Sequence, residues 1–207
     1  MLEILGRSSS INVRKVLWLC VELELPYRQE AWGTGFRSTH TAEFLALNPN
    51  GLVPVIRDGA FVLWESNTIC RYLAGKQGRD DLLPRDPASR AIVEQWMDWQ
   101  ATELNDAWRY AFMGLVRKSP KHDDPSLIDA SIEQWNRHMT MLDARLEQTG
   151  AYVAGETLTL ADICVGLSTH RWFATPIERP ALAAVDAYYE RLGERAGFRE
   201  HGRNGVP

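Results

Sequence analysis

The sequence is poor in cysteine and has no long apolar run. Its three cysteines, Cys20, Cys70 and Cys164, are odd in number and far apart. They argue against a disulfide framework and are typical of small buried residues in a reducing cytoplasm. No apolar stretch approaches the roughly 20 residues of a membrane-spanning helix, and the opening segment MLEILGR lacks the layout of a signal peptide. We therefore expect a cytoplasmic protein without a membrane partner.

A surplus of positive charge is also missing. The formal net charge is -4 and no basic run occurs, which gives no electrostatic reason to expect nucleic acid as a partner. The sequence has no C-x-x-C pair for disulfide exchange, no G-x-S-x-G motif for a hydrolytic serine, and no glycine-rich phosphate loop. The five histidines show no metal-ligand spacing, so we expect no metal site. They are His40, His122, His138, His170 and His201.

The composition that is present is typical of a soluble globular protein. The chain has 207 residues, of which 45% are hydrophobic and 24% are charged. This length is enough to bury a sizeable core, in one large domain or in two small ones. The order of strand and helix patterns decides between these two arrangements.

The first 79 residues alternate between strand-like and helical patterns. Apolar side chains from Val13 to Val21 recur on one helix face, and Pro26 ends that helix. Asp58 and Gly59 are typical of a hairpin turn. The expected elements are a strand at 2–5, this helix, a weak strand at 27–31, a short helix at 41–49, strands at 53–56 and 61–64, and a helix at 65–78. A crossover followed by a hairpin predicts a mixed four-stranded sheet, parallel in its first pair and antiparallel in its last, with three helices.

From residue 80 onward the pattern is helical throughout. A charged, proline-punctuated linker at 80–86 comes first, and apolar residues then recur at helical spacing over 88–117 and 126–148. The sequence therefore predicts two unequal domains, an α/β domain at 1–79 and an all-α domain at 87–207.

Four short motifs occur in order along the chain. They are SINVR at 10–14, NPNGLVPVI at 48–56, LWESNTICRYL at 63–73 and TLTLADI at 157–163. In the last motif Thr159 is followed by Asp162, a capping-box variant that marks a helix start. Together the four resemble motifs of the cytosolic glutathione transferase superfamily, and Ser10 in the first one suggests its Ser-type, theta-like bacterial members.

This resemblance implies a fold, an activity and an assembly. The N-terminal domain is expected to be thioredoxin-like and to bind glutathione as co-substrate, and the helical domain to form a pocket for a small hydrophobic electrophile. The expected activity is that of a glutathione transferase, in a detoxification role and as a homodimer. The alternatives are a non-catalytic glutathione- or partner-binding module of the same fold and a glutathione-dependent isomerase or reductase. A zeta-type isomerase is expected to show Ser-Ser-Cys near the first helix, whereas this chain has SSSIN.

Pro54 is unusual within a strand pattern because proline cannot donate to a sheet ladder. One interpretation is an edge-strand proline. The other is a cis bond after Val53, which is rare at about 5–6% of X–Pro bonds. The resemblance favours the second, which leaves the Val53 N–H and C=O free to pair with an extended peptide such as glutathione.

Glu65 and Ser66 begin a helix directly after a strand. A helix N-terminus suits a carboxylate, although Ser66 is alternatively a simple N-cap. The resemblance implies that the Ser66 hydroxyl and N–H receive the γ-glutamyl carboxylate and that Glu65 orients the neighbouring amine. Arg37 or His40 is the candidate for the glycyl carboxylate.

The serines at 8–10 are candidates for the hydrogen-bond donor to the thiolate of glutathione. In a transferase the glutathione thiolate is the nucleophile. Lowering the pKa of the glutathione thiol by two units needs about 2.7 kcal/mol. One hydrogen bond to a charged group supplies roughly 1.5–3 kcal/mol and a helix N-terminus about 0.3–1 kcal/mol, so one hydroxyl is sufficient. We choose Ser10 as this donor, with Asn12 as a second N–H donor or a helix cap, and Ser9 in reserve. The alternative for Ser10 is a helix cap only.

Aromatic and apolar side chains at the domain boundary are the candidates for the electrophile pocket. At helical spacing such residues are more often core, and they do not identify a substrate. The candidates are Ile11, Trp32, Trp108, Tyr110, Phe112 and Met113.

Overall fold

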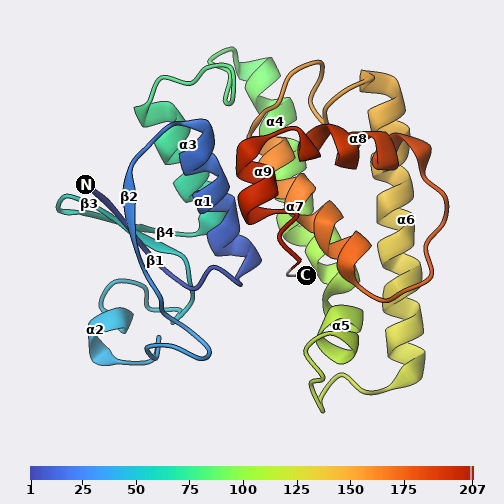
Figure 1. Ribbon diagram of the computed structural model, residues 1–207, viewed down its shortest axis with the longest axis horizontal. Helices are drawn as coiled ribbons and strands as arrows, with labels where there is room; N and C mark the ends of the chain where they lie inside the picture. The colour runs from blue at the N-terminus through green and yellow to red at the C-terminus, as the bar shows by residue number, and fades with distance from the viewer. Residues whose placement is uncertain (206) are drawn as a thin grey trace.

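The computed structural model describes residues 1–205 and 207 and places a four-stranded sheet beside a helical domain (Figure 1). The strands are β1 (Leu2–Leu5), β2 (Tyr27–Glu30), β3 (Val55–Asp58) and β4 (Phe61–Trp64). The helices are α1 (Ile11–Glu22), α2 (Ala42–Leu45), α3 (Ser66–Lys76), α4 (Pro87–Trp99), α5 (Asn105–Leu115), α6 (Pro125–Thr149), α7 (Leu160–Ala174), α8 (Ala183–Gly193) and α9 (Ala196–His201). A π-helical turn, η1 (Gln100–Leu104), joins α4 to α5.

The sheet has the predicted mixed topology. Its order is β2-β1-β3-β4, with β1 parallel to β2 and antiparallel to β3, and β3 antiparallel to β4. Strand β3 begins at Val55, opposite Leu5, two residues later than predicted, because Pro54 has no N–H to donate to the ladder. The α/β domain followed by an all-helical domain is confirmed.

Helices cover both faces of the sheet, because its side chains alternate between two cores. Ile4 and Ile56 belong to the large core that continues into the helical domain, whereas Leu5 and Val55 pack in a second, smaller core. Helices α1 and α3 lie between the sheet and the helical domain, and α2 lies on the other side (Figure 1). Phe44 of α2 closes the smaller core.

The long helix predicted at 88–117 is interrupted at its middle. The π-helical turn η1 begins at Gln100, whose side chain is fully buried, and π-turns of this kind often mark a functional or strained position. Helix α7 is buried on nearly all sides, as expected for a helix at the centre of a domain. None of the described helices is long and apolar enough to cross a membrane.

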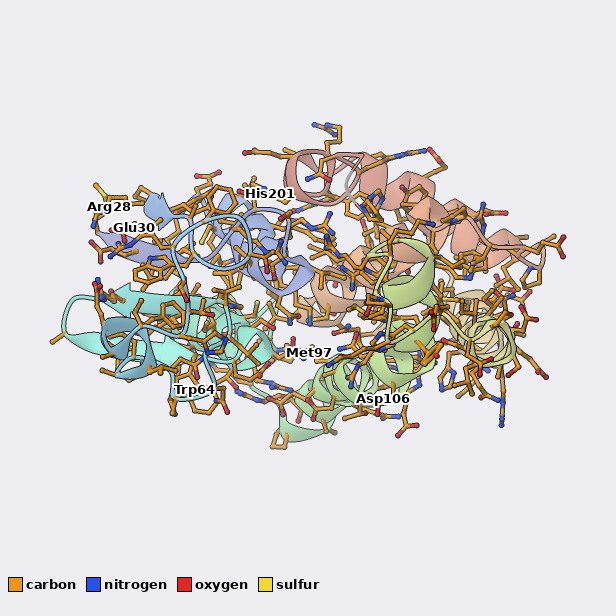
Figure 2. The ribbon with its side chains drawn as sticks, turned by 90° about the horizontal axis from the view of Figure 1, so that it is seen from below. Arg28, Glu30, Trp64, Met97, Asp106 and His201 are labelled. Atoms are coloured by element: carbon orange, nitrogen blue, oxygen red, sulfur yellow. The ribbon has the colours of Figure 1, made fainter. Side chains whose placement is uncertain are left out.

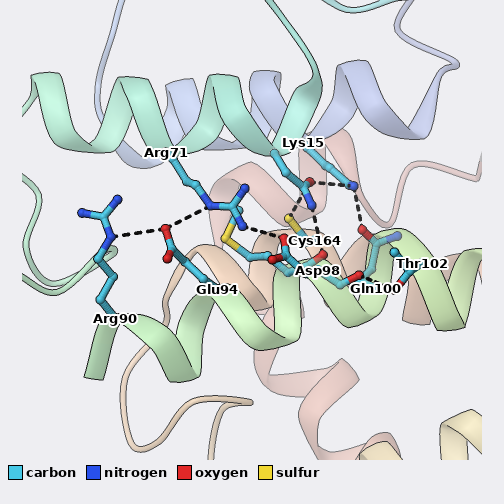
Figure 3. A network of polar contacts seen from close by, with 10 residues as sticks. Lys15, Arg71, Arg90, Glu94, Asp98, Gln100, Thr102 and Cys164 are labelled. Atoms are coloured by element: carbon cyan, nitrogen blue, oxygen red, sulfur yellow. Dashed lines mark hydrogen bonds and ion pairs between the residues drawn. The ribbon is translucent and has the colours of Figure 1, made fainter. Parts of the chain in front are cut away.

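A buried polar network joins the two domains (Figure 3). Lys15 of α1 is 1% exposed and donates from Nζ to Asn67 Oδ1 at 3.0 Å and to Gln100 Oε1 at 2.7 Å. Asn67 in turn donates to the backbone oxygen of Met97, a buried residue at the junction of the domains (Figure 2). At the edge of the network Arg71 of α3 approaches Asp98 at 2.7 Å.

This network has a consequence for the orientation of the domains. A buried ammonium is costly unless its N–H groups are hydrogen-bonded, and the acceptors of Lys15 come from both domains. Gln100 also donates from Nε2 to Ser168 and Asn105. Because separating the domains would take Gln100 away from Lys15 and Met97 away from Asn67, the network fixes the position of α1, on which the candidate site depends.

Candidate functional site

A pocket of about 280 Å³ lies where the N-terminal ends of α1 and α3 meet the loop before β3. Its lining residues come from three segments that are far apart in the sequence. They are Asn12, Asn48, Asn50, Leu52, Val53, Pro54, Trp64, Glu65 and Ser66. The tertiary structure thus brings together five of the residues that the sequence singled out, namely Asn12, Val53, Pro54, Glu65 and Ser66.

The polar side chains in this pocket are not used for internal hydrogen bonds. Within the described part of the chain no hydrogen bond involves the side chain of Asn12, Glu65 or Ser66. Asn12 lies in the first turn of α1 and Ser66 in the first turn of α3. Two helix N-termini therefore meet at one pocket, and their unpaired N–H groups and partial positive charges favour anionic groups there.

The peptide bond between Val53 and Pro54 is cis, as predicted. No backbone hydrogen bond to Val53 is found among the described residues, so its N–H and C=O are available to an extended ligand. The loop before α1 lies directly beside it, since a Cβ added at Gly6 would approach the Val53 Cβ to 3.1 Å and a Val13 methyl to 2.5 Å.

Glu65 adopts a backbone conformation that is uncommon for a residue with a side chain. Its φ is 76° and its ψ is 108°, which costs on the order of 1–3 kcal/mol, and such strain often occurs at functional sites. Glu65 precedes α3 as the N-cap residue, yet its side chain makes no capping hydrogen bond and is exposed. The Glu65 side chain therefore lines the pocket and makes no hydrogen bond within the described part of the chain.

Sequence reasoning missed Asn48, Asn50 and Trp64 as lining residues. Asn48 is 2% exposed; it donates to the Leu52 carbonyl at 2.8 Å and accepts from Asn50, so it holds the shape of the loop. The Asn-Pro-Asn-Gly turn was the available signal, because asparagine side chains often bond to nearby backbone in turns. Trp64, at the end of β4, is 40% exposed (Figure 2).

His40 and Arg37, the two candidates for the glycyl carboxylate, differ in position. A Cβ added at Gly51 would come within 3.0 Å of the His40 ring, so His40 lies against the loop that forms the pocket wall. Arg37 approaches Glu43 at 3.1 Å and Glu30 at 3.6 Å. Its charge is already balanced, and Arg37 is not a lining residue.

Trp32 was expected in the electrophile pocket, and the structure corrects this. The Trp32 side chain is 1% exposed and packs against Phe44, with a ring-centroid distance of 4.9 Å. The Arg37 guanidinium covers it at 3.9 Å from the ring centroid. Trp32 is therefore a core residue of the smaller cluster, because its ring fills the space between the sheet and α2.

The three serines before α1 differ in their contacts. Ser8 is exposed and exchanges hydrogen bonds with Gln29 at 3.1–3.3 Å. Ser10 is the N-cap residue of α1, but its side chain makes no capping hydrogen bond. No hydrogen bond of the Ser9 hydroxyl occurs in the described part of the chain either. Neither Ser9 nor Ser10 lines the pocket, although Asn12, two residues later, does.

The remaining candidates for the electrophile pocket lie along α5 and at the start of α1. Ile11, Trp108 and Phe112 are 7%, 8% and 3% exposed. They are therefore mostly buried in the core and offer little surface to a ligand. Tyr110 packs on the His122 ring with a centroid distance of 4.9 Å, and Met113 is half-buried.

The cysteines of the chain do not take part in chemistry at this site. All three are free and buried, and burial raises the pKa of Cys20 to about 12. Burial also raises the pKa of Cys70 and of Cys164. Because the thiolate is the reactive form, these side chains act as buried apolar groups. The described residues contain no group of three His, Cys, Asp or Glu side chains that would hold a metal ion.

Two family models match the chain. The model "Glutathione S-transferase, N-terminal domain" matches residues 9–76, and "Glutathione S-transferase, C-terminal domain" matches residues 107–195. The chain is 40% identical over 202 residues to the glutathione S-transferase GstB of Escherichia coli (strain K12), covering 97% of each protein.

Solved structures show the same similarity. The theta class glutathione S-transferase from Xanthomonas axonopodis pv. citri, with glutathione bound, has a TM-score of 0.90 and 39% identity, covering 97% of this chain and 96% of that chain. A delta-class glutathione transferase from Nilaparvata lugens has a TM-score of 0.88 and 26% identity, covering 100% of this chain and 95% of that chain.

Proposed function

The chain belongs to the glutathione S-transferase family and is a glutathione transferase, and from this premise we propose that the pocket at the start of α1 and α3 binds glutathione. The pocket's polar groups fit a tripeptide with two carboxylates and one amine. Ser66 and the α3 N-terminus suit the γ-glutamyl carboxylate, and Glu65 suits the amine. The free backbone of Val53 pairs with the extended peptide.

The observation that carries this proposal is the set of unused polar groups at two helix N-termini. Buried or half-buried polar side chains normally find partners within the protein, whereas those of Asn12 and Ser66 have none among the described residues. His40 on the neighbouring loop is the candidate for the glycyl carboxylate. Leu52, a lining residue that is 66% exposed, offers no polar side-chain group to the tripeptide, so we expect it to contribute little to glutathione binding.

Ser10 is the proposed thiolate donor, with Asn12 as the second donor and Ser9 in reserve. The Ser10 hydroxyl is not used to cap α1, which leaves it available to hold a thiolate by a charge-assisted hydrogen bond. The role of Ser10 is therefore to stabilise the nucleophile, and the thiol proton leaves to solvent. The activated thiolate attacks a small electrophile held beside α5.

Replacing Ser66 by alanine tests the glutathione site. We expect Ser66→Ala to raise the dissociation constant for glutathione about 10- to 150-fold, because one hydrogen bond to a carboxylate is lost, worth roughly 1.5–3 kcal/mol. The matched control is Ser126→Ala, since Ser126 also lies at a helix start but bonds to Asp124. The measurement is isothermal titration with glutathione, alongside turnover with a panel of electrophiles. Equal affinity in wild type and Ser66→Ala would contradict the assignment, and binding without any turnover would indicate a non-catalytic module.

We expect the protein to act in the cytoplasm as a homodimer, with the first domain of one chain against the second domain of the other. Closed two-fold pairing is the commonest assembly of soluble proteins, and both domains expose large apolar side chains. Phe61 and Trp64 on β4 are 46% and 40% exposed, and Ile92 and Met141 in the helical domain are 41% and 48% exposed. Sedimentation velocity at micromolar concentration should give twice the monomer mass of 23.5 kDa, and a monomer mass would contradict the prediction.

A further inference from the structure

The part of the pocket beside the loop before β3 contains no cationic side chain. Among the described residues that line the pocket, Glu65 is the charged one, and neither a lysine nor an arginine occurs. Glutathione carries two carboxylates, and the N-terminus of α3 suits the γ-glutamyl one. In the proposed binding mode, a tripeptide that pairs with Val53 places its glycyl carboxylate at the opposite end, which is lined by Asn48, Asn50 and Leu52. We call these three residues the glycyl end of the pocket.

The two asparagines of the glycyl end already bond to each other and to the loop backbone. Asn48 is 2% exposed, and its Nδ2 donates to the Leu52 carbonyl at 2.8 Å. The Asn48 Oδ1 accepts from both the backbone N–H and the Nδ2 of Asn50, each at 3.0 Å. Asn50 keeps one further side-chain N–H, because an amide nitrogen carries two. This N–H is uncharged, and it donates to a carboxylate or to an amide carbonyl alike.

Arg37, the arginine on the neighbouring loop, is engaged in three contacts of its own. Its guanidinium approaches Glu43 at 3.1 Å and Glu30 at 3.6 Å, and it covers the Trp32 ring at 3.9 Å from the ring centroid. The His40 ring lies against the loop of the pocket wall, and a neutral imidazole offers one N–H donor. The side-chain donors that remain for the ligand are therefore neutral N–H groups, which do not distinguish a carboxylate from an amide by charge.

Resting on the proposed glutathione site, we propose that the pocket recognises its co-substrate by the γ-glutamyl-cysteinyl part and accepts derivatives whose glycyl carboxylate is neutralised, as an amide or an ester, as readily as glutathione itself. The exposed apolar walls of the pocket agree with this. Leu52 is 66% exposed and Trp64 is 40% exposed (Figure 2). Apolar surface suits a neutral substituent, whereas it leaves a partly desolvated carboxylate without compensation.

The reacting part of the co-substrate is the same in glutathione and in these derivatives. The thiol belongs to the cysteinyl residue, which the Val53 backbone and Ser10 are proposed to hold. The γ-glutamyl groups meet Glu65 and Ser66 in both cases. A derivative that binds should therefore also be turned over, with kcat close to that of glutathione.

A matched pair of peptides tests the proposal, namely glutathione and glutathione amide, in which a carboxamide replaces the glycyl carboxylate. Isothermal titration at about pH 8, where histidine side chains are ordinarily neutral, gives the two dissociation constants. We expect wild-type protein to bind the amide within about threefold of glutathione, whereas loss of a charge-assisted hydrogen bond would weaken the amide by about 10- to 150-fold. The peptide with an α-linked glutamate should bind at least about 10-fold more weakly than glutathione, because it displaces the groups that Glu65 and Ser66 hold.

Replacing Leu52 by lysine supplies the missing positive charge at an exposed position. We expect Leu52→Lys to favour glutathione over the amide by about 10-fold, as for one new charge-assisted hydrogen bond. Leu127→Lys is the matched control, since it adds the same charge at another exposed leucine, 49% exposed on α6, and should keep the wild-type ratio. Arg37→Gln should keep that ratio too, because Arg37 stays in its ion pairs with Glu43 and Glu30.

The outcomes separate this proposal from the glutathione site on which it rests. A wild-type preference for glutathione of about 10-fold or more, or a ratio that Leu52→Lys leaves unchanged, would overturn it while binding of glutathione still supports the site. A ratio that Arg37→Gln alters would also overturn it, because that arginine would then contact the ligand. Failure of the wild type to bind either peptide would instead count against the glutathione site and, with it, this proposal.

Discussion

Replacing Ser10 by alanine is expected to lower turnover at neutral pH about 10- to 100-fold. The physical reason is a rise of one to two units in the pKa of the bound glutathione thiol, which corresponds to about 1.4–2.7 kcal/mol. The affinity for glutathione should change much less, because Ser66, Glu65 and Val53 remain. Loss of a capping side chain would cost about 0.5–2 kcal/mol of stability, but the Ser10 side chain makes no capping hydrogen bond, so we expect a smaller loss.

The measurement is an ultraviolet titration of the thiolate in the glutathione complex. Ser9→Ala and Ser8→Ala are the matched controls, because the three hydroxyls are neighbours and Ser8 already bonds to Gln29. An unchanged thiol pKa in Ser10→Ala would defeat the assignment. A shift that appears only in Ser9→Ala would move the role one residue back.

Replacing Asp162 by alanine is expected to lower the free energy of unfolding by about 3–5 kcal/mol. Asp162 is fully buried at the start of α7, and its carboxylate accepts hydrogen bonds from the Val153 and Thr159 N–H groups and from the Thr159 and Tyr188 hydroxyls. Alanine would leave these buried donors unpaired beside the central helix of the second domain. Urea unfolding, followed by tryptophan fluorescence, measures the loss; a change below about 1 kcal/mol would contradict the prediction.

The contribution of Asp162 to the free energy of unfolding depends on pH in a defined direction. Burial raises the pKa of Asp162 from 3.8 to about 6, although its hydrogen bonds act in the opposite direction. The native state therefore holds the proton more tightly than the unfolded chain, so the stability that this group contributes falls as the pH rises from about 4 to about 6. Asp162→Asn does not titrate and is the control. The stability difference between wild type and Asp162→Asn should narrow over this range, and a difference that widens would show the opposite shift.

Much of the fold was predictable because its signals are local. The apolar face from Val13 to Val21 predicted α1, and the Asp58-Gly59 turn predicted the β3–β4 hairpin, both of which are observed. Thr159 and Asp162 predicted the capping box of α7, which the structure contains. Propensity, periodicity and capping act within a few residues, so one sequence is enough to find them. The π-turn at Gln100 and the end of α5 were not predicted, since the helical spacing of apolar residues does not reveal a single extra residue in a turn.

Sequence by itself determined the two-part architecture and the residue types that begin α1 and α3, whereas the cis bond before Pro54 was favoured only through the family resemblance. Tertiary structure alone decided which side chains are free to act. It placed Trp32 in a core and brought Arg37 into ion pairs with Glu43 and Glu30, because burial and ion pairing depend on neighbours that folding brings together. It likewise joined Lys15 of α1 to acceptors from both domains, Asn67 and Gln100. A sequence lists polar and charged residues, but only packing decides which partners each of them meets.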